Sequence, residues 1–308
     1  MDEYIKKLED NLNSVIKGKQ EVIRLLIITL LAKGHILLED IPGVGKTTLS
    51  KALAKSISGK FSRIQFTPDL LPTDIIGSPI YNPKEGTFNF KQGAVFSNIL
   101  LADEINRASP RTQSSLLESM SENQVTVDGI SYKLELPFLV IATQNPIEYH
   151  GTYPLPEAQM DRFAIQLSLG YPNKEEEFDI LYSQRNNHPL NSLQSVLSCQ
   201  DLINIQEKVN EINVEKSIAN YLLEIVHQTR NNNDIKLGVS PRGSITLFSM
   251  IRANAYLEGR NYCLPDDVKK LAEYVLSHRI VLETKAKYSG LKKSKVIKDI
   301  IDKIPIPR

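Results

Sequence analysis

The chain has 308 residues, and its 37 lysine and arginine residues nearly balance 36 aspartate and glutamate residues, for a formal charge of +1. No overall field therefore attracts it to nucleic acid or to an anionic membrane. The longest apolar run, residues 22–32, contains Arg24 and is shorter than the roughly 20 residues that cross a bilayer. With a charged N-terminus, MDEYIKKLED, and only two cysteines, the chain is expected to be cytoplasmic.

Short apolar runs alternate with helical patterns in the first half of the chain, which is typical of a parallel sheet covered by helices. After the first run, Leu49, Leu53 and Ile57 recur at every fourth residue and predict one apolar helix face. The predicted strands are residues 35–39, 63–66, 98–102, 138–143 and 163–168.

Two segments interrupt this alternation and are predicted to be inserted β-hairpins. The first, at about 76–93, contains YNPKEGTFNF with Glu85-Gly86 near the turn. The second, at about 123–138, has Asp128-Gly129 between two alternating segments.

The composition changes after Pro172, where strand patterns disappear. The sequence thus predicts an α/β core of residues 1–172, followed by an all-helical domain of residues 173–308. The lysine-rich tail from Lys285 onward is predicted to be a solvated helix. The predicted helices before it are residues 174–184, 199–212, 215–230, 243–259 and 265–283.

The stretch HILLEDIPGVGKTTLS places a glycine-rich loop between a strand and an amphipathic helix. In such a phosphate loop Gly43 and Gly45 permit close approach of the backbone, Lys46 reaches the outer phosphates and Thr47 offers its hydroxyl to Mg²⁺. Asp40 stands where the general motif has its first glycine, and we expect its carboxylate to cap a turn and point away from the phosphates. The alternative is a turn that only caps a helix.

A second strand ends in two acids, NILLADE. Asp103 can hold Mg²⁺ through its water shell, and Glu104 can orient and polarise an attacking water. Asn145, in ATQNP, follows a strand expected beside this one and can hydrogen-bond the γ-phosphate or the water. Alone, the acids could be a helix N-terminal charge pair and Asn-Pro a turn. Because ligands of parallel sheets bind beyond the carboxyl ends of the strands, the combination favours ATP hydrolysis.

Four longer strings closely resemble the MoxR family of AAA+ ATPases, namely GHILLEDIPGVGKT, FTPDLLPTDIIG, LLADEINRASPRTQSSLLESMSENQVTVDG and ATQNPIEYHGTYPLPEAQMDRF. The segment GVSPRG resembles the lid motif of the same family, so the resemblance runs nearly end to end. It implies a three-layer α/β ATPase core with inserted hairpins and a small all-α lid. It further implies a ring, usually hexameric, with ATP and Mg²⁺ at the subunit boundaries.

The resemblance assigns roles to three residues outside the phosphate loop and the acidic pair. Asn145 matches the first sensor, and Arg162 in DRF matches the arginine finger that enters a neighbour's site. Arg242 in SPR matches the second sensor of the lid, which would couple ATP to the lid. An open alternative for Arg162 is an ion pair with Asp161 or Glu157.

The segment VIKGKQEVI resembles the family's adenine contact. Arg107 is left open between an interface contact and a surface ion pair. The residues expected to bind the nucleotide or its metal are Val15, Ile16, Gly18, Pro42, Gly43, Val44, Gly45, Lys46, Thr47, Thr48 and Asp103.

The resemblance also implies a chaperone-like role in maturing or activating protein complexes, sometimes with metal-cofactor insertion, alongside partners that carry von Willebrand factor A domains. The second hypothesis is a ring motor on DNA. The near-neutral charge of the chain disfavours it, and so does the first hairpin, which offers little more than Lys84 and Lys91 as cations. A nucleotide-gated scaffold with little turnover is the third.

Overall fold

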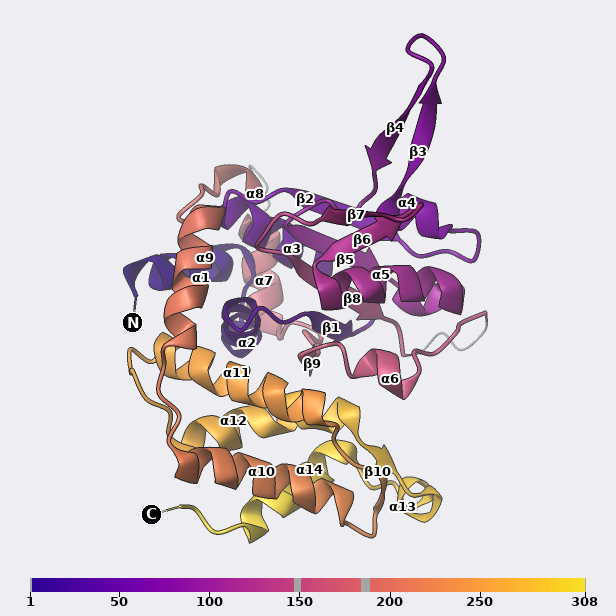
Figure 1. The fold of residues 1–308 in the computed structure, drawn as a ribbon. Coiled ribbons are helices and arrows are strands. Elements are labelled where there is room, and N and C mark those ends of the chain that lie inside the picture. The colour runs from indigo at the N-terminus through magenta and orange to yellow at the C-terminus, as the bar shows by residue number, and fades with distance from the viewer. Residues whose placement is uncertain (1, 147–150, 184–188, 308) are drawn as a thin grey trace.

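The computed structural model describes residues 2–146, 151–183 and 189–307. A five-stranded parallel sheet lies at the centre of the N-terminal part, in the order β2-β5-β8-β1-β9 (Figure 1). Its strands are β1 (Ile36–Glu39), β2 (Phe61–Gln65), β5 (Ile99–Asp103), β8 (Leu139–Gln144) and β9 (Ile165–Leu167). The parallel sheet expected from the sequence is confirmed, and β8 does lie beside β5.

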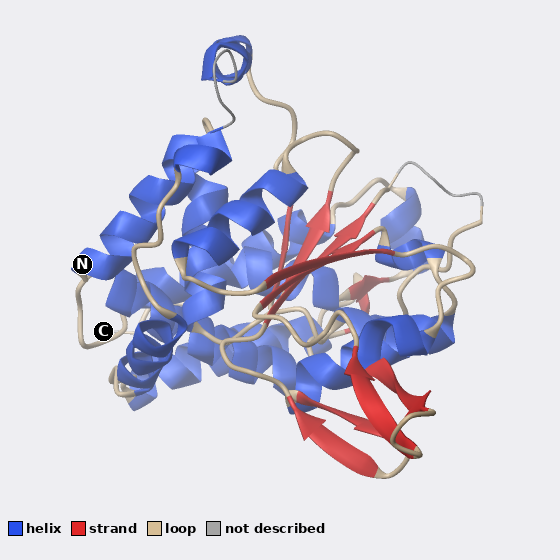
Figure 2. Cartoon of the chain, turned by 90° about the horizontal axis from the view of Figure 1, so that it is seen from above, coloured by secondary structure: helices blue, strands red, loops and turns tan. Residues whose placement is uncertain are grey.

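Side chains of each strand pack alternately on the two faces of the sheet, which produces three layers. In β1, Ile36 and Leu38 belong to one buried cluster and Leu37 to the other. The first cluster includes residues of α1 (Glu3–Val15), α2 (Gln20–Leu31), α3 (Lys46–Ser56) and α9 (Cys199–Asn210). The second includes residues of α4 (Pro72–Ile76), η1 (Ile105–Arg107) and α5 (Pro110–Glu122), with α6 (Glu157–Met160) packed against it. Figure 2 shows the sheet between these helical layers.

Both predicted hairpins are present. They are β3 (Gly77–Asn82) with β4 (Thr87–Gln92), and β6 (Gln124–Val127) with β7 (Ile130–Lys133). The first projects far from the body (Figure 1), and near its base Phe90 stacks on Tyr132 of the second at a centroid distance of 4.0 Å. In the second, Asp128 and Gly129 have φ of +50° and +78°, which suits a two-residue hairpin turn.

The C-terminal part is a helical lid, as expected. It packs against the first face of the core, where α11 contacts α2 and α12 contacts β9. Its helices are α10 (Lys216–Arg230), α11 (Pro241–Leu257), α12 (Pro265–Leu276), η2 (Ser277–Arg279), α13 (Thr284–Tyr288) and α14 (Lys293–Lys303). Among the described helices, none is both long and apolar enough to cross a membrane.

Strands in the lid were not expected, and this part of the prediction is wrong. β10 (Ile235–Leu237) pairs antiparallel with β11 (Val281–Leu282), and β11 falls where the sequence predicted the end of the helix 265–283. Strands of three and two residues are too short to show a period of two. Their pairing joins distant segments, so no local pattern reveals it.

The lysine-rich tail also differs from its prediction. α14 is amphipathic rather than solvated, since Val296, Ile297, Ile300 and Ile301 are buried and lie in the first core cluster. It packs against α10 and α12, while its lysines stay on the outer side. The apolar residues at every third or fourth position are the signal that the lysine content obscured.

Two short helices connect core and lid. α7 (Lys174–Ser183) follows Pro172, and α8 (Pro189–Ser192) packs against α1 and α3 of the core. Residue 184, the end of the predicted helix 174–184, lies outside the described residues. Positions 147–150 of the string ATQNPIEYHGTYPLPEAQMDRF also lie outside them.

Candidate functional site

The glycine-rich loop leads from β1 into the N-terminus of α3. Gly43 and Gly45 have φ of +87° and +98°, and a Cβ added to either would meet no atom within 4 Å. The loop is thus left-handed where only glycine is at ease, and it faces open space. The Lys46 ammonium donates to the carbonyls of Asp40 and Ile41, at 3.0 and 3.2 Å. These are the features of an anion site at a helix N-terminus.

Asp40 faces away from this loop, as the sequence predicted. Its buried carboxylate accepts hydrogen bonds from the Ser168 hydroxyl at 2.8 Å and from the backbone N–H groups of Leu169 and Gly170, at 2.6 and 3.0 Å. Contrary to the prediction from the sequence, the Asp40 carboxylate does not cap its own turn. It connects the start of the loop to the segment that follows β9. The substitution of the motif's first glycine therefore braces the loop.

The acidic pair lies beside the loop, in one cavity of about 350 Å³. Asp103 ends β5, and its Oδ2 accepts from both Nη2 and Nε of Arg63 on β2, at 2.7 and 3.2 Å. Glu104 Oε2 accepts from Gln65 Nε2 at 2.8 Å and pairs with Arg107 at 3.3 Å. Glu104 itself has φ +56°, a left-handed conformation that is uncommon for a side chain of this size and typical of functional sites. The described lining residues are Pro42, Gly43, Gly45, Lys46, Thr47, Thr48, Arg63, Gln65, Asp103 and Glu104.

Thr143 on β8 joins the two acids. Its hydroxyl donates to Asp103 Oδ1 at 2.6 Å and accepts the backbone N–H of Glu104 at 2.8 Å. Asn145 follows β8 and is buried, but it is not among the described residues that line the cavity. Arg63, Gln65 and Thr143 were not predicted as site residues. Arg107 has the ion pair that was one of its two alternatives, and the interface role stays a prediction.

A second cavity of about 200 Å³ adjoins the loop on its other side. Val15 and Ile16, predicted to contact the adenine, line it together with Val44. Gly18 lies between two lining lysines and has φ +72°. The remaining described lining residues are Lys17, Lys19, Gly43, Gly45, Thr48, Gly170, Pro172, Ile180, Ser183 and Pro189. The cavity shares loop residues with the acidic one, so the two can hold opposite ends of one nucleotide.

The donor set of the acidic cavity suits Mg²⁺. Thr47 and Asp103 offer the hard oxygen ligands that this ion prefers. No cluster of three or more His, Cys, Asp or Glu capable of holding a metal occurs within residues 2–146, 151–183 and 189–307. A metal bound here would therefore complete its shell with phosphate oxygens and water, as Mg²⁺ commonly does at nucleotide sites.

Arg162 and Arg242 lie together at the opposite edge of the sheet, meaning the edge at which the parallel strands begin. Both line a cavity of about 350 Å³ that includes Gly34 and His35, the residues just before β1. From Gly34 to Asp40 the chain is extended over about 20 Å, so neither arginine is at the phosphate loop of its own chain. In this arrangement Arg242 lies away from the phosphate loop of its own chain, and its coupling of ATP to the lid stays a prediction.

Arg162 does not form the ion pair that was its alternative. Its guanidinium donates to the Leu117 carbonyl and the Ser121 hydroxyl on α5. Asp161 instead pairs with Arg279 at 3.0 Å, and it also accepts from the Ser240 hydroxyl at 2.8 Å. The side chain of Arg162 is thus held at the surface by two neutral acceptors.

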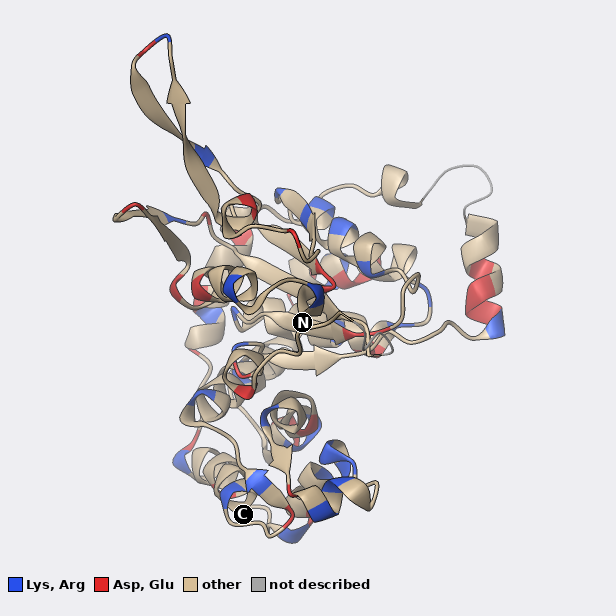
Figure 3. Ribbon diagram, turned by 90° about the vertical axis from the view of Figure 1, so that its right-hand side faces the viewer, with Lys and Arg blue, Asp and Glu red and all other residues tan. Residues whose placement is uncertain are grey.

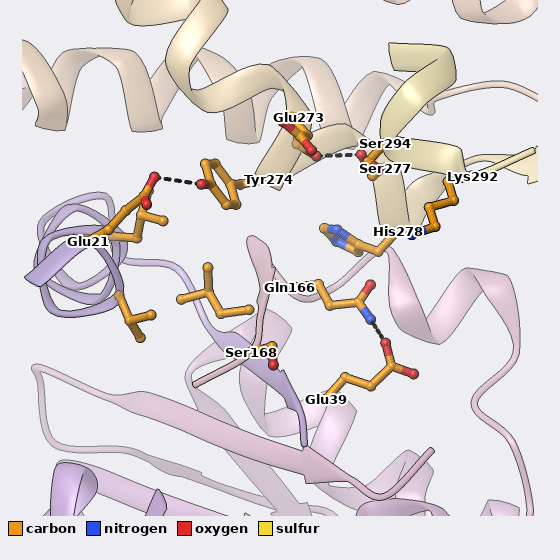
Figure 4. A pocket seen from close by; sticks show the side chains of 13 residues that line it. Glu21, Glu39, Gln166, Ser168, Glu273, Tyr274, Ser277, His278, Lys292 and Ser294 are labelled. Carbon is orange, nitrogen blue, oxygen red and sulfur yellow. Dashed lines mark hydrogen bonds between the residues drawn. The ribbon is translucent and has the colours of Figure 1, made fainter. Parts of the chain in front are cut away.

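The lid is fixed to the core by buried polar contacts. Arg279 is almost fully buried. Burial lowers the pKa of its guanidinium to about 10, although the negative charge of Asp161 acts to raise it. Burial also holds the pKa of His278 well below its usual value, and His278 Nε2 contacts the Phe163 carbonyl at 3.0 Å. Beside these residues, a cavity of about 700 Å³ separates sheet and lid (Figure 4), and the Tyr274 hydroxyl donates to Glu21 across it at 2.6 Å.

The parallel sheet, phosphate loop, paired acids and helical lid together define an ATPase of the AAA+ class. The model of the ATPase family associated with various cellular activities (AAA) matches residues 35–165, and the AAA lid domain model matches residues 227–302. The uncharacterized protein YeaC of Bacillus subtilis is 49% identical over 98% of this chain and 94% of its own.

Two further relatives place the chain more closely. Chaperone MoxR1 of Mycobacterium tuberculosis is 41% identical over 96% of this chain and 80% of its own. A crystal structure of a Cytophaga hutchinsonii protein is also 41% identical and superposes with a TM-score of 0.92, covering 99% of this chain and 95% of that one. The chain belongs to the MoxR family of AAA+ ATPases.

Proposed function

We propose that the protein hydrolyses ATP and uses the reaction to remodel partner proteins, working as a ring of identical subunits. The observation that carries this proposal is the meeting of Lys46, Asp103 and Glu104 around one cavity beside an open glycine loop. Backbone N–H groups and a lysine at one wall suit phosphate, and two acids at the other suit a metal and a water.

In this proposal each group has a distinct task. The loop amides and Lys46 bind the phosphates, and Glu104 orients the attacking water and polarises it. Gln65 and Arg107 hold the Glu104 carboxylate in place, while Thr143 fixes its backbone. Mg²⁺, held by Thr47 and Asp103, would neutralise charge that develops on the phosphate oxygens. Arg63 must then share Asp103 with the metal or release it.

We further propose that the neighbouring subunit completes each site. Arg162 and Arg242 lie together, at the sheet edge opposite their own phosphate loop. A head-to-tail ring brings that edge to the phosphate loop of the next copy, where guanidinium groups would stabilise transition-state charge. This changes the role given to Arg242: both arginines would act in trans, and the lid carrying Arg242 would sense the neighbour's nucleotide.

The expected output is chaperone-like. A relative at 41% identity is named a chaperone, and this supports the same role here. Maturation of protein complexes, metal-cofactor insertion, a hexameric ring, partners with von Willebrand factor A domains and a cytoplasmic location all stay predictions. The exclusion of nucleic acid also stays a prediction. It is supported by the first hairpin, which exposes Ile80, Tyr81 and Phe88, an apolar surface that favours a protein client. Single-stranded DNA that binds saturably and stimulates turnover would favour the motor instead.

The decisive experiment is Glu104→Gln. The amide cannot accept a proton or polarise water as the carboxylate does, so turnover should fall by roughly 10²–10⁴. ATP binding, followed with a fluorescent analogue, should persist because the phosphate loop is untouched. Glu118→Gln, an exposed acid on α5, is the matched control and should keep full turnover.

Full turnover in Glu104→Gln would remove Glu104 from the catalytic role. Negligible turnover in the parent, measured after assembly with its clients present, would favour the nucleotide-gated scaffold. A pull-down with Glu104→Gln in ATP would then identify the client, since a stalled remodeller retains what it normally releases.

A further inference from the structure

α7 stands away from the body of the molecule (Figure 3, right). None of its ten residues is buried, although its sequence KEEEFDILYS is rich in apolar side chains. A helix of a globular protein normally turns its apolar stripe toward the core. The exception is therefore informative about what covers α7.

The inner face of α7 belongs to the nucleotide pocket. Glu176, Ile180 and Ser183 recur with helical spacing and are half-buried. Ile180 and Ser183 line the cavity that holds Val15 and Ile16, and Glu176 lies 4.0 Å from the Lys19 ammonium. Whatever fills that cavity thus touches one side of α7.

The outer face is apolar and open. Phe178, Leu181 and Tyr182 are 55%, 68% and 59% exposed, and the rings of Phe178 and Tyr182 pack at a centroid distance of 4.3 Å. At 100° per residue this stripe lies opposite the inner face; Glu175 and Glu177 flank it on its two sides, and Lys174 lies at its N-terminal end. An ordered apolar stripe rimmed by acids is typical of a protein-binding surface.

A complementary surface exists on the same chain. The edge that carries Arg162 and Arg242 also carries Lys33 and the side chain of Ile245, which is 68% exposed. No Asp or Glu is found among the described residues that line this cavity. A basic surface with an exposed apolar residue matches an apolar stripe rimmed by acids.

We propose that the outer face of α7 docks onto Lys33 and Ile245 of a second copy of this chain, beside the two arginines of that copy that enter the nucleotide site. The proposal rests on the ring proposed above and specifies one of its contacts. α7 lies at the nucleotide edge of the sheet and Ile245 at the opposite edge, so the contact is heterologous and repeats around a ring. Since the same short helix touches the nucleotide pocket on its other side, nucleotide binding positions the docking stripe and thereby promotes assembly.

The test uses the full chain with Glu104→Gln as parent, so that ATP stays bound. Phe178, Leu181 and Tyr182 are all changed to Ser, and assembly is followed by sedimentation over a range of protein concentrations with ATP. The triple variant should need at least about tenfold more protein for half-assembly, because it loses the buried aromatic anchors of the contact. Affinity for a fluorescent ATP analogue should stay within about threefold, since the changed side chains face away from the pocket.

The matched control is Tyr288→Ser, an 87% exposed aromatic on α13 of the lid. It should assemble like the parent. If the triple variant also assembles like the parent, the docking proposal is overturned while the ring stands. If the parent itself stays monomeric in ATP, the proposed ring fails and the docking proposal fails with it.

A cross-link tests the choice of partner surface. In a Cys199→Ser background, Leu181→Cys and Ile245→Cys are combined in one chain, which is assembled with ATP and oxidised. Disulfide-linked dimers and higher species should form and disappear on reduction. Either single cysteine alone should give a far weaker ladder. An assembled sample that yields no more linked species with both cysteines than with one would overturn the proposed pairing.

Discussion

The two edges of the central sheet differ in how completely their side chains are held. At the carboxyl edge, Asp103 and Glu104 are fixed by Arg63, Gln65 and Thr143, three residues from neighbouring strands. At the opposite edge, Arg242 is exposed. In the proposed ring, the preorganised half-site at one edge would be completed by the accessible cations of the next copy's opposite edge.

This difference suits the two kinds of task. Groups that bind phosphate and orient water act best when their geometry is fixed before reaction. Groups that report the state of a neighbour must be able to enter and leave a site. The Arg162 guanidinium donates to two neutral acceptors on α5 and has no carboxylate partner there. No buried ion pair would therefore have to be broken for it to enter a neighbour's site.

The strongest test of this difference between the two edges is Arg162→Ala, for which we expect the largest change in turnover. Loss of a guanidinium that acts in the transition state should lower turnover by about 10³. ATP affinity should change little, since Arg162 lies far from its own phosphate loop. Steady-state turnover and equilibrium nucleotide binding of the assembled protein measure the two.

A mixing experiment separates a neighbour's site from the chain's own. Arg162→Ala subunits lack the arginine but retain Glu104, and Glu104→Gln subunits have the reverse. If Arg162 acts across the boundary, mixing two inactive preparations should restore part of the turnover. Subunits that demonstrably co-assemble and yet recover no activity would contradict the trans role.

Arg242→Ala sharpens the same comparison with a smaller effect. An electrostatic contact to the phosphates that is made by one residue should be worth about 10²-fold in turnover. Because Arg242 lies with Arg162, Glu104→Gln subunits should rescue it by mixing as well. Rescue of Arg162→Ala alone would return Arg242 to its own chain's nucleotide and would require the lid to move. Ser244→Ala, on the same helix but outside that cavity, is a control that should retain activity.

Asp40→Asn tests how much the hydrogen bonds at the carboxyl edge of the sheet contribute to stability. The carboxylate accepts from one hydroxyl and two backbone N–H groups while almost fully buried, and an amide cannot satisfy all three donors. The free energy of unfolding should fall by about 3 kcal/mol, as measured by chemical denaturation. Asp10→Asn, an exposed acid on α1, should change it little. A fully stable Asp40→Asn protein would argue that the three contacts contribute nothing.

The sequence was informative where chemistry is encoded in consecutive residues. The phosphate loop, the acids at the end of β5 and the helix start at Ser240 are local patterns, and the Ser240 hydroxyl accepts the Gly243 N–H at 3.2 Å. Arg63 and Gln65 carried no such signal, because they are ordinary polar residues on β2. Only the pairing of β2 with β5, which sets Arg63 beside Leu101 and Gln65 beside Asp103, brings them to the acids.

The position of Arg242 shows a second limit. Its motif predicts a sensor but not whose nucleotide it senses, since that depends on how the lid docks against the core. The docking is decided by distant contacts, such as Arg279 with Asp161, and by the packing of α11 on α2 and of α12 on β9. β10 and β11 were missed for the same reason: their partners lie far along the chain.

The smallest expected effect concerns pH at the arginine edge. His35 is buried beside Arg162, and burial lowers its pKa to about 4. Its Nδ1 accepts the Val140 N–H at 3.0 Å, so Nε2 donates to the Met120 carbonyl at 3.0 Å and the ring is neutral. The unfolded chain, with a pKa near 6.5, binds a proton at a higher pH than the folded one.

Stability from His35 is therefore complete above about pH 6.5 and is lost as the pH falls from there toward 4. At pH 5 the free energy of unfolding should be about 2 kcal/mol lower than at pH 7 from this residue. His278 contributes in the same direction, so His35→Gln should reduce the slope without abolishing it. His227→Gln, an exposed histidine on α10, should leave the slope unchanged. If the free energy of unfolding depended on pH equally in the parent and in His35→Gln, the His35 imidazole would have to be hydrated. Its position between β8 and α5 would then be less rigid than its two hydrogen bonds indicate.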